Sequence, residues 1–248
     1  MDLGLTGLRA LVTGGSKGIG RAVVETLLAE GATVSFCARD AEGVDTAAAE
    51  TGATGTALDV ADGAALAGWV AASAEAMGGV DVVVSNVSAL AIGPGEENWR
   101  SSFEVDVMAT VRLVEAAEPH LRASASGALV TVASVSGREI DFASGSYGAM
   151  KAALVHYTQA LALTWAPDGL RANSVSPGNT YFPGGVWATI EATNTELWDT
   201  AMGLNPTGRM ATPQEVASAV VFLAAPVSGF TTGTNLVVDG ALTRGVQL

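Results

Sequence analysis

Short apolar runs alternate with longer stretches rich in Ala, Leu and Val along nearly the whole chain. The short runs have the length of β-strands, and several are unbroken apolar sequences, of which Val82–Val84 is the plainest. Unbroken apolar strands are typical of a parallel sheet that is buried on both faces. The predicted strands are Arg9–Val12, Thr33–Ala38, Thr54–Leu58, Val80–Val84, Ala128–Ala133, Arg171–Val175 and Asn235–Val238.

The longer stretches between these runs predict helices. In one of them large apolar residues recur at spacings of four, four, four and three, which predicts a helix face turned toward the sheet. That stripe consists of Trp99, Phe103, Val107, Val111 and Val114. The predicted helices are Gly18–Glu30, Asp62–Met77, Glu97–Arg122, Gly145–Trp165 and Pro213–Ala224.

Alternation of strands and helices predicts an α/β fold with a doubly wound parallel sheet of about seven strands between two helical layers. Ligands of such folds bind beyond the carboxyl ends of the strands. Residues 179–207 interrupt the rhythm with four aromatic residues, two prolines and three acids, and we interpret them as a substrate-covering segment. No linker-like composition divides the chain, so residues 1–248 are expected to form one domain.

The amino-acid composition disfavours several classes of function. Of the 248 residues 25 are acidic and 12 basic, and this net charge of −13 disfavours binding to nucleic acid or to an anionic membrane. No apolar run approaches the ~18 residues of a membrane span, and no secretory signal is visible. Cys37 is the single cysteine, which excludes an internal disulfide and favours a cytoplasmic location. With only His120 and His156 besides it, we predict no His- or Cys-based metal site.

A glycine-rich turn follows the first predicted strand and opens the first predicted helix. It reads Thr13-Gly14-Gly15-Ser16-Lys17-Gly18-Ile19-Gly20. Glycines are needed where a backbone turns tightly and approaches a pyrophosphate, whose charge a helix N-terminus favours. A plain strand-to-helix turn is the alternative interpretation. The position directly after the first strand favours a dinucleotide-binding turn.

Tyr147 and Lys151 lie four residues apart near the start of a predicted helix, so both side chains project from one face. A phenol with an ordinary pKa near ~10 is a poor acid or base at neutral pH unless a neighbouring ammonium stabilises its phenolate. The chain has only two lysines, and both stand in candidate motifs, Lys17 in the glycine-rich turn and Lys151 here. We therefore predict a functional pair rather than two surface residues at helical spacing.

Together these motifs resemble the short-chain dehydrogenase/reductase family in its compact single-domain branch, notably its 3-oxoacyl reductase-like members. The resemblance covers essentially the whole chain and implies a Rossmann fold with three αβα layers. It rests on T-G-x-x-x-G-x-G from Thr13 and on Y-x-x-x-K from Tyr147, in that order. Further matches to the family pattern are Ser134, thirteen residues before the tyrosine, Asp59 and Val60 at the adenine ring, Asn86, Pro177-Gly178 beside the nicotinamide, and Val238-Asp239-Gly240 near the end.

The family's chemistry implies a role for each matching residue. Tyr147 would exchange a proton with the substrate oxygen while a hydride moves between nicotinamide and substrate carbon. Ser134 would hydrogen-bond that oxygen, although Ser136 stands two residues away as an alternative. Lys151 would hold the ribose hydroxyls and lower the pKa of Tyr147. The implied cofactor-binding residues are Gly14, Ser16, Lys17, Gly18, Ile19, Gly20, Arg39, Asp59, Val60, Asn86, Tyr147, Lys151, Pro177, Gly178 and Thr180.

The chain departs from the family pattern at three places. Ser88 stands where the family has a glycine after the fourth strand. Asp106 replaces the asparagine that organises a proton-relay water, so it is either a proton relay or a partly buried acid with a structural partner. Phe182 replaces a threonine five positions after Pro177, which leaves Thr180 as the nearest hydroxyl for the carboxamide.

Two cations point to the cofactor. Members of the family that prefer NAD carry an acid at the end of the second strand, where this chain has Ala38 followed by Arg39. Arginine pairs well with a 2′-phosphate, and Lys17 would add a second charge there. We therefore expect NADP(H) in preference to NAD(H).

The substrate is less constrained by the sequence. Tyr181, Phe182, Trp187, Trp198 and Met202 suggest an apolar roof, and residues 173–207 contain no lysine or arginine. This favours a neutral ketone or secondary alcohol over a phosphorylated sugar. A 3-oxoacyl thioester reductase and a non-catalytic NADP(H)-binding sensor are the alternatives.

Self-association is a further expectation. The Ala/Val-rich faces of Glu97–Arg122 and Gly145–Trp165 suit a homo-oligomeric interface, as in the tetramers common in the family.

Overall fold

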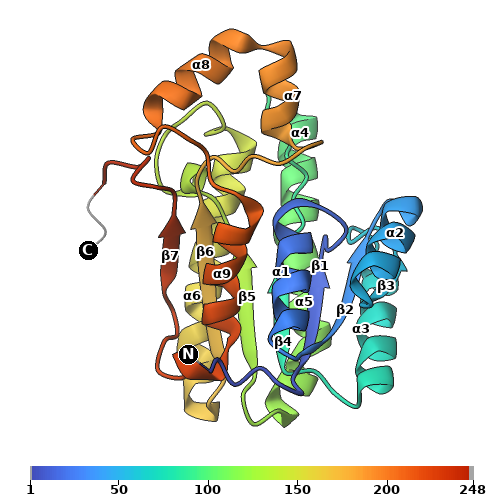
Figure 1. Ribbon diagram of the computed structural model, residues 1–248. Helices are drawn as coiled ribbons and strands as arrows, with labels where there is room; N and C mark the ends of the chain where they lie inside the picture. Colours follow the sequence, from blue (N-terminus) through green and yellow to red (C-terminus); the bar gives the residue numbers. More distant parts are fainter. Residues whose placement is uncertain (1, 246–248) are drawn as a thin grey trace.

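The computed structural model describes residues 2–245 and has a sheet of seven parallel strands at its centre, in the order β3-β2-β1-β4-β5-β6-β7 (Figure 1). This confirms the predicted α/β fold with a doubly wound parallel sheet. The order reverses between β1 and β4, and a sheet of this kind binds ligands at that switch point. The strands are β1 (Arg9–Thr13), β2 (Thr33–Ala38), β3 (Thr54–Ala57), β4 (Val82–Ser85), β5 (Ala128–Val132), β6 (Arg171–Pro177) and β7 (Asn235–Val238).

Helices cover both faces of the sheet (Figure 1). They are α1 (Gly18–Ala29), α2 (Ala41–Thr51), α3 (Gly63–Met77), α4 (Glu96–Ser102), the π-helix η1 (Phe103–Met108), α5 (Ala109–Ala123), α6 (Ser146–Trp165), α7 (Val186–Thr193), α8 (Thr195–Leu204) and α9 (Pro213–Ala224). Three short 3₁₀ turns complete the set: η2 (Val135–Gly137), η3 (Ala166–Asp168) and η4 (Pro226–Ser228).

The sheet is buried on both sides because the side chains of its apolar strands pack into two separate hydrophobic cores. Ala10 and Val12 of β1 pack with α1, α2 and α9, whereas Leu11 between them packs with α3, α5 and α6. β4 alternates in the same way, because Val82 and Val84 belong to the first of these cores and Val83 belongs to the second. Apolar strand residues on both faces of the sheet are therefore shielded from water. This is why the strand sequences are unbroken apolar runs and do not alternate in polarity.

The helix predicted over Glu97–Arg122 is interrupted, and its apolar stripe is wrong in its first half. Trp99 and Phe103 are 45% and 46% exposed, whereas Ser102, Asp106 and Thr110 are buried. The reason is η1, because its wider π turn changes the helical phase between α4 and α5. An acid and two hydroxyl residues consequently take the place of the predicted aromatic face.

Two further helical regions differ from the sequence prediction. α2 was not predicted, because only Val44 and Ala47 of its residues are buried and its apolar stripe is weak. The segment 179–207, expected to be irregular, contains α7 and α8, which lie beyond the carboxyl ends of β5, β6 and β7 (Figure 1). Trp187, Ala201 and Met210 form a small core of their own there.

No helix of residues 2–245 combines the length and the apolar character that crossing a membrane requires. Over the same residues, no three His, Cys, Asp or Glu side chains are grouped as a metal site would need.

Candidate active site

A cleft of about 460 Å³ lies beyond the carboxyl ends of the strands. Its lining extends from Arg39, directly after β2, to Trp187 in α7. The glycine-rich turn lines one part of the cleft, and Ser134, Tyr147 and Lys151 line another. Residues more than a hundred positions apart therefore meet at the edge of the sheet where α/β folds bind their ligands.

The glycine-rich turn is shaped by contacts that exclude side chains. Gly14 and Gly18 have left-handed φ angles of +72° and +57°. A Cβ on Gly20 would lie 2.2 Å from the Gly14 carbonyl oxygen, so helix α1 packs directly against the turn. Gly20 itself does not line the cleft, and its role is this close packing. The amino end of α1 then faces the cleft, where its unpaired N–H groups favour an anion.

Asn86 fixes the turn to the end of β4. Its backbone N–H donates to Thr13 Oγ1 at 2.9 Å, and its Nδ2 donates to the Thr13 carbonyl at 3.0 Å. The sequence predicted Asn86 as a cofactor contact, and the structure places it in the cleft lining with a second task. It joins β1 and β4, the two strands that flank the switch point.

Two cations lie at one end of the cleft. Lys17 from the glycine-rich turn and Arg39 after β2 both line it and both are exposed. Neither forms an ion pair with another described residue. Both charges are therefore available to an anionic ligand group at this end.

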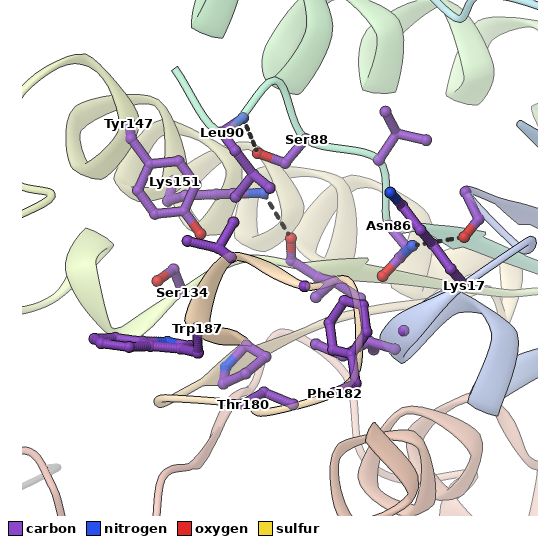
Figure 2. A pocket seen from close by; sticks show the side chains of 18 of the residues that line it. Lys17, Asn86, Ser88, Leu90, Ser134, Tyr147, Lys151, Thr180, Phe182 and Trp187 are labelled. Atoms are coloured by element: carbon purple, nitrogen blue, oxygen red, sulfur yellow. Dashed lines mark hydrogen bonds between the residues drawn. The ribbon is translucent and has the colours of Figure 1, made fainter. Parts of the chain in front are cut away.

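Ser134, Tyr147 and Lys151 converge at the other end (Figure 2). Ser134 directly precedes the 3₁₀ turn η2, and its Oγ accepts the Ser136 N–H at 3.1 Å. This bond uses Ser136 to orient Ser134 and leaves the Ser134 hydroxyl proton free. Tyr147 and Lys151 lie one turn apart on α6, and the Lys151 ammonium is 5.6 Å from the centre of the Tyr147 ring.

Lys151 is a buried cation with two protein neighbours. Its side chain is only 2% exposed, and its Nζ donates to the Val132 carbonyl at 3.1 Å. Nζ also lies 3.0 Å from Asp106 Oδ1. Burial acts to lower the pKa of Lys151, but the electrostatic interactions of its ammonium with Asp106 and with Tyr147 raise it, and the result is a pKa above the usual value. The ammonium therefore stays charged despite its burial.

Comparisons with known proteins identify the family. A family model described as enoyl-(acyl carrier protein) reductase matches residues 14–243. Isoepoxydon dehydrogenase from Penicillium expansum is 39% identical over 256 aligned positions, which cover 100% of this chain and 99% of that enzyme. The chain belongs to the short-chain dehydrogenase/reductase family.

Solved structures of other short-chain dehydrogenases/reductases share the fold over nearly the whole chain. L-sorbose reductase from Gluconobacter frateurii, complexed with NADPH and L-sorbose, has a TM-score of 0.89 at 28% identity, covering 99% of this chain and 100% of that one. An NADPH-bound short-chain oxidoreductase from Pseudomonas aeruginosa, described as containing an atypical catalytic center, has a TM-score of 0.87 at 30% identity, covering 96% and 98%.

Most residues that the family pattern selected lie together in the cleft. Asp59 is an exception among the cofactor candidates, because it does not line the cleft and its Oδ1 accepts the Ala61 N–H at 3.0 Å. Asp106 also lies outside the lining, behind Lys151. The predicted residues in the lining are Gly14, Ser16, Lys17, Gly18, Ile19, Arg39, Val60, Asn86, Ser134, Tyr147, Lys151, Pro177, Gly178 and Thr180.

Phe182 occupies the space between two glycines. A Cβ on Gly18 would lie 2.6 Å from its ring, and one on Gly185 would lie 2.9 Å from it. The ring thus reaches from the segment after β6 to the glycine-rich turn (Figure 2). The Thr180 hydroxyl, which the sequence left as the nearest for a carboxamide, donates to the Gly178 carbonyl at 3.1 Å.

The wall near Tyr147 includes residues that the sequence did not single out. Leu90, Ile92, Phe142 and Val186 line the cleft there, and Phe142 meets Trp187 edge-on with ring centres 5.5 Å apart. These residues carry no motif, since three of them are isolated apolar residues in loops and Val186 only begins α7, so no periodicity marks them. One signal is visible afterwards: Leu90 has a left-handed φ of +49°, which is unusual for a residue other than glycine.

The predicted aromatic roof is only partly correct. Phe182 and Trp187 line the cleft, but Tyr181, Trp198 and Met202 do not. These three pack against the small core formed by Trp187, Ala201 and Met210. They support the wall instead of forming it.

Proposed function

We propose that this protein is an NADP(H)-dependent oxidoreductase that moves a hydride between the nicotinamide and a neutral ketone or secondary alcohol. The observation that carries the proposal is the convergence of Ser134, Tyr147 and Lys151 at one end of a cleft whose other end has a glycine-rich turn and two free cations. The turn and the cations suit a phosphorylated dinucleotide, and the three polar residues suit proton transfer to a carbonyl oxygen.

The residues present fit a dinucleotide cofactor. The turn at Gly14 and Gly18 has no room for side chains, which lets a pyrophosphate approach the amino end of α1. Arg39 and Lys17 would hold the 2′-phosphate, Lys151 the ribose of the nicotinamide, and Pro177, Gly178 and Thr180 its ring. The NADPH in the L-sorbose reductase and Pseudomonas aeruginosa structures supports this choice over NAD(H).

At the end of the cleft that holds Ser134, Tyr147 and Lys151, each side chain has a different role in proton transfer to the substrate oxygen. When bound, NADP(H) supplies the hydride for reduction or accepts it in oxidation. The Tyr147 hydroxyl donates its proton to the carbonyl oxygen, and the Ser134 hydroxyl donates a hydrogen bond to the same oxygen. The Lys151 ammonium stabilises the negative charge that develops on the Tyr147 oxygen, because a cation next to a phenol favours its phenolate.

The substrate end of the cleft favours a neutral molecule. Its wall is made of Leu90, Ile92, Phe142, Val186 and Trp187. The one acid near them, Asp141, is already occupied, since its Oδ2 accepts the Ser136 hydroxyl at 2.6 Å and its Oδ1 accepts the Ala143 N–H at 2.8 Å. The names of two relatives, isoepoxydon dehydrogenase and L-sorbose reductase, also support a small uncharged substrate.

The test is initial-rate oxidation of NADPH by the purified protein with a panel of neutral ketones and one β-ketoacyl thioester. We expect turnover of the free ketones and much slower turnover with NADH. Turnover confined to the thioester would contradict the proposed substrate class and favour a 3-oxoacyl thioester reductase. Tight binding of NADPH without turnover of any compound would contradict the proposed enzymatic activity and favour a non-catalytic NADP(H)-binding sensor.

We also propose a cytoplasmic homo-oligomer, a tetramer or a dimer. The faces that the sequence pointed to carry Trp99 and Phe103 and, on α6, Leu163, which is 78% exposed. Large exposed apolar side chains, here on α4, η1 and α6, are typical of surfaces that a second copy covers. Sedimentation equilibrium tests this, and a monomer of 24.9 kDa at all concentrations would refute it.

A further inference from the structure

Asp106 is an acid in a position where burial alone would disfavour a charge. Its side chain is 0% exposed, and it belongs to η1, the π turn between α4 and α5. The two carboxylate oxygens have different partners. Oδ2 accepts the Ala89 N–H at 3.1 Å, and Oδ1 lies 3.0 Å from the Lys151 ammonium. No described donor is aligned on Oδ1 well enough for a hydrogen bond, so this second contact is an ion pair.

The ion pair changes the charge that Tyr147 experiences. The charged or titratable side chains that act on Lys151 are Asp106 from η1 and Tyr147 from α6 itself. The third neighbouring element, β5, contributes only the neutral Val132 carbonyl. A lone buried cation would stabilise a phenolate strongly, whereas a cation paired with a carboxylate stabilises it less, since the two fields oppose each other at the phenol.

The same carboxylate also holds the substrate wall. Ala89 lies in the loop between β4 and α4, next to Leu90. Within this loop the Leu90 N–H donates to Ser88 Oγ at 3.1 Å, and the Ser146 hydroxyl at the start of α6 donates to the Ala91 carbonyl at 2.8 Å. Asp106 thus joins the loop that carries Leu90 to the lysine behind Tyr147.

We propose that Asp106 is a positioning residue that partly neutralises Lys151, so that Tyr147 loses its proton at a higher pH than it would beside an unpaired ammonium. This inference rests on the proposed function, and it goes further by naming a residue outside the cleft that sets the pH dependence of the reaction. Reduction needs the phenol as a proton donor, whereas oxidation needs the phenolate as a base. Alcohol oxidation is therefore expected to begin at a higher pH with the Asp106 charge than without it.

The decisive variant is Asp106→Asn, which removes the charge and keeps an oxygen for the Ala89 N–H. We expect the acidic limb of the pH profile for alcohol oxidation to move about one pH unit lower, the order of magnitude that one nearby unit charge produces inside a protein. On that limb oxidation becomes about tenfold faster at a given pH, while the plateau rate stays within about threefold. Substrate KM for a ketone that contacts Leu90 should stay within about threefold, because the amide keeps the bond to Ala89.

Asp81→Asn is the matched control. Asp81 is also a buried acid with a cationic partner, because its Oδ2 lies 2.7 Å from Arg9 Nε, but neither residue of this pair lines the cleft. This variant should lose stability and leave the pH profile where it is. If Asp106→Asn behaves in the same way, Asp106 is merely structural and the inference is wrong. A plateau rate that falls about tenfold or more without a shift of the limb would instead make Asp106 a proton relay.

A second readout does not depend on turnover. The ultraviolet difference absorbance between a protein and its Tyr147→Phe partner reports the phenolate of Tyr147 without cofactor. In the Asp106→Asn background this phenolate should form about one pH unit lower than in the wild-type background. If the Asn protein does not fold, Asp106→Ser takes its place, since it is also neutral. Equal titration in both backgrounds overturns the inference, whereas loss of the proposed function would show itself as undiminished turnover by Tyr147→Phe.

Discussion

The two ends of the cleft are built by different means. At the end with the glycine-rich turn, the backbone itself forms the site, and side chains are excluded from it at Gly14 and Gly20. At the end with Tyr147, loops and the α7–α8 segment form the wall with apolar side chains such as Leu90 and Trp187. A backbone site accepts few residue types and so leaves a motif in the sequence, whereas a packed wall accepts many combinations and leaves none.

The largest effect is expected from filling the backbone site. Gly20→Ala would place its Cβ 2.2 Å from the Gly14 carbonyl oxygen and 2.5 Å from Asn86 Nδ2, and the Gly14 backbone leaves little room for relaxation. We expect a loss of about 3 kcal/mol or more in the free energy of unfolding and no measurable NADPH binding. Urea denaturation and calorimetric titration with NADPH measure the two.

Gly68→Ala is the control for this change. Gly68 lies within α3, and an added Cβ there meets nothing within 4 Å. This variant should gain about 0.5–1 kcal/mol, because alanine is the better helix former. A stable Gly20→Ala protein that binds NADPH normally would show that the turn is not the rigid site described above.

A smaller effect is expected at the cations. Arg39→Ala should weaken NADPH binding about 10- to 100-fold, the range for a hydrogen-bonded charge, and should change NADH binding little. Arg100→Ala is the control, since Arg100 is an exposed arginine of α4 that pairs with Glu96 away from the cleft. Equal losses for NADPH and NADH in Arg39→Ala would mean that Arg39 does not distinguish the two cofactors.

A substitution at the substrate end of the cleft also tests whether the two ends act independently. Trp187→Ala removes a wall residue that packs against Phe142 and Trp198. We expect kcat/KM for an apolar ketone to fall about tenfold, from lost apolar contact, while NADPH affinity stays within about threefold. Trp187→Phe should lose less. Parallel losses in ketone turnover and NADPH affinity would show that the ends are coupled.

The smallest effect concerns Cys37 of β2, behind the glycine-rich turn. Burial raises the pKa of this thiol to about 12, although the Gly14 N–H opposes the shift. Because folding raises its pKa from the ordinary value of 9.0, the thiol favours the folded state below that pH, and this contribution declines as the pH rises toward about 12. A thiol-reactive dye at mildly alkaline pH should label Cys37 only in urea. Rapid labelling of the folded protein would contradict the burial.

The sequence predicted the sheet and the Tyr147–Lys151 pair because both leave local patterns, whereas Ser134 followed from the family resemblance. The strands were visible as unbroken runs, and Tyr147 and Lys151 as a spaced pair. The exposure of Trp99 was not predictable, because a π turn leaves no mark in the periodicity that precedes it. The sequence drew attention to Asp106 as a departure from the family pattern. Its partner Lys151 follows only from the way in which η1 packs on α6, forty-five residues further along the chain, and its partner Ala89 only from the path of the loop between β4 and α4.

One further signal was present but faint. Asp40 caps the amino end of α2 by accepting the Gly43 N–H at 3.2 Å, and Gly52 ends the helix in a left-handed conformation. Such a pair of end signals marks a helix even when its apolar stripe is weak. The wall residues Leu90 and Phe142 had no comparable mark, since their positions depend on loops that only the folded chain brings together.

The most direct test of the account is single-turnover transfer of the hydride from NADPH to a ketone by the Tyr147→Phe protein. Tyr157→Phe is the matched control, because Tyr157 lies on the same helix outside the cleft. We predict that Tyr147→Phe binds NADPH within about threefold of the wild-type affinity and transfers hydride at least about a hundredfold more slowly, the contribution of a positioned proton donor. Tyr157→Phe should keep the wild-type rate. Transfer at the wild-type rate by Tyr147→Phe would contradict the assignment of the proton donor and with it the proposed mechanism.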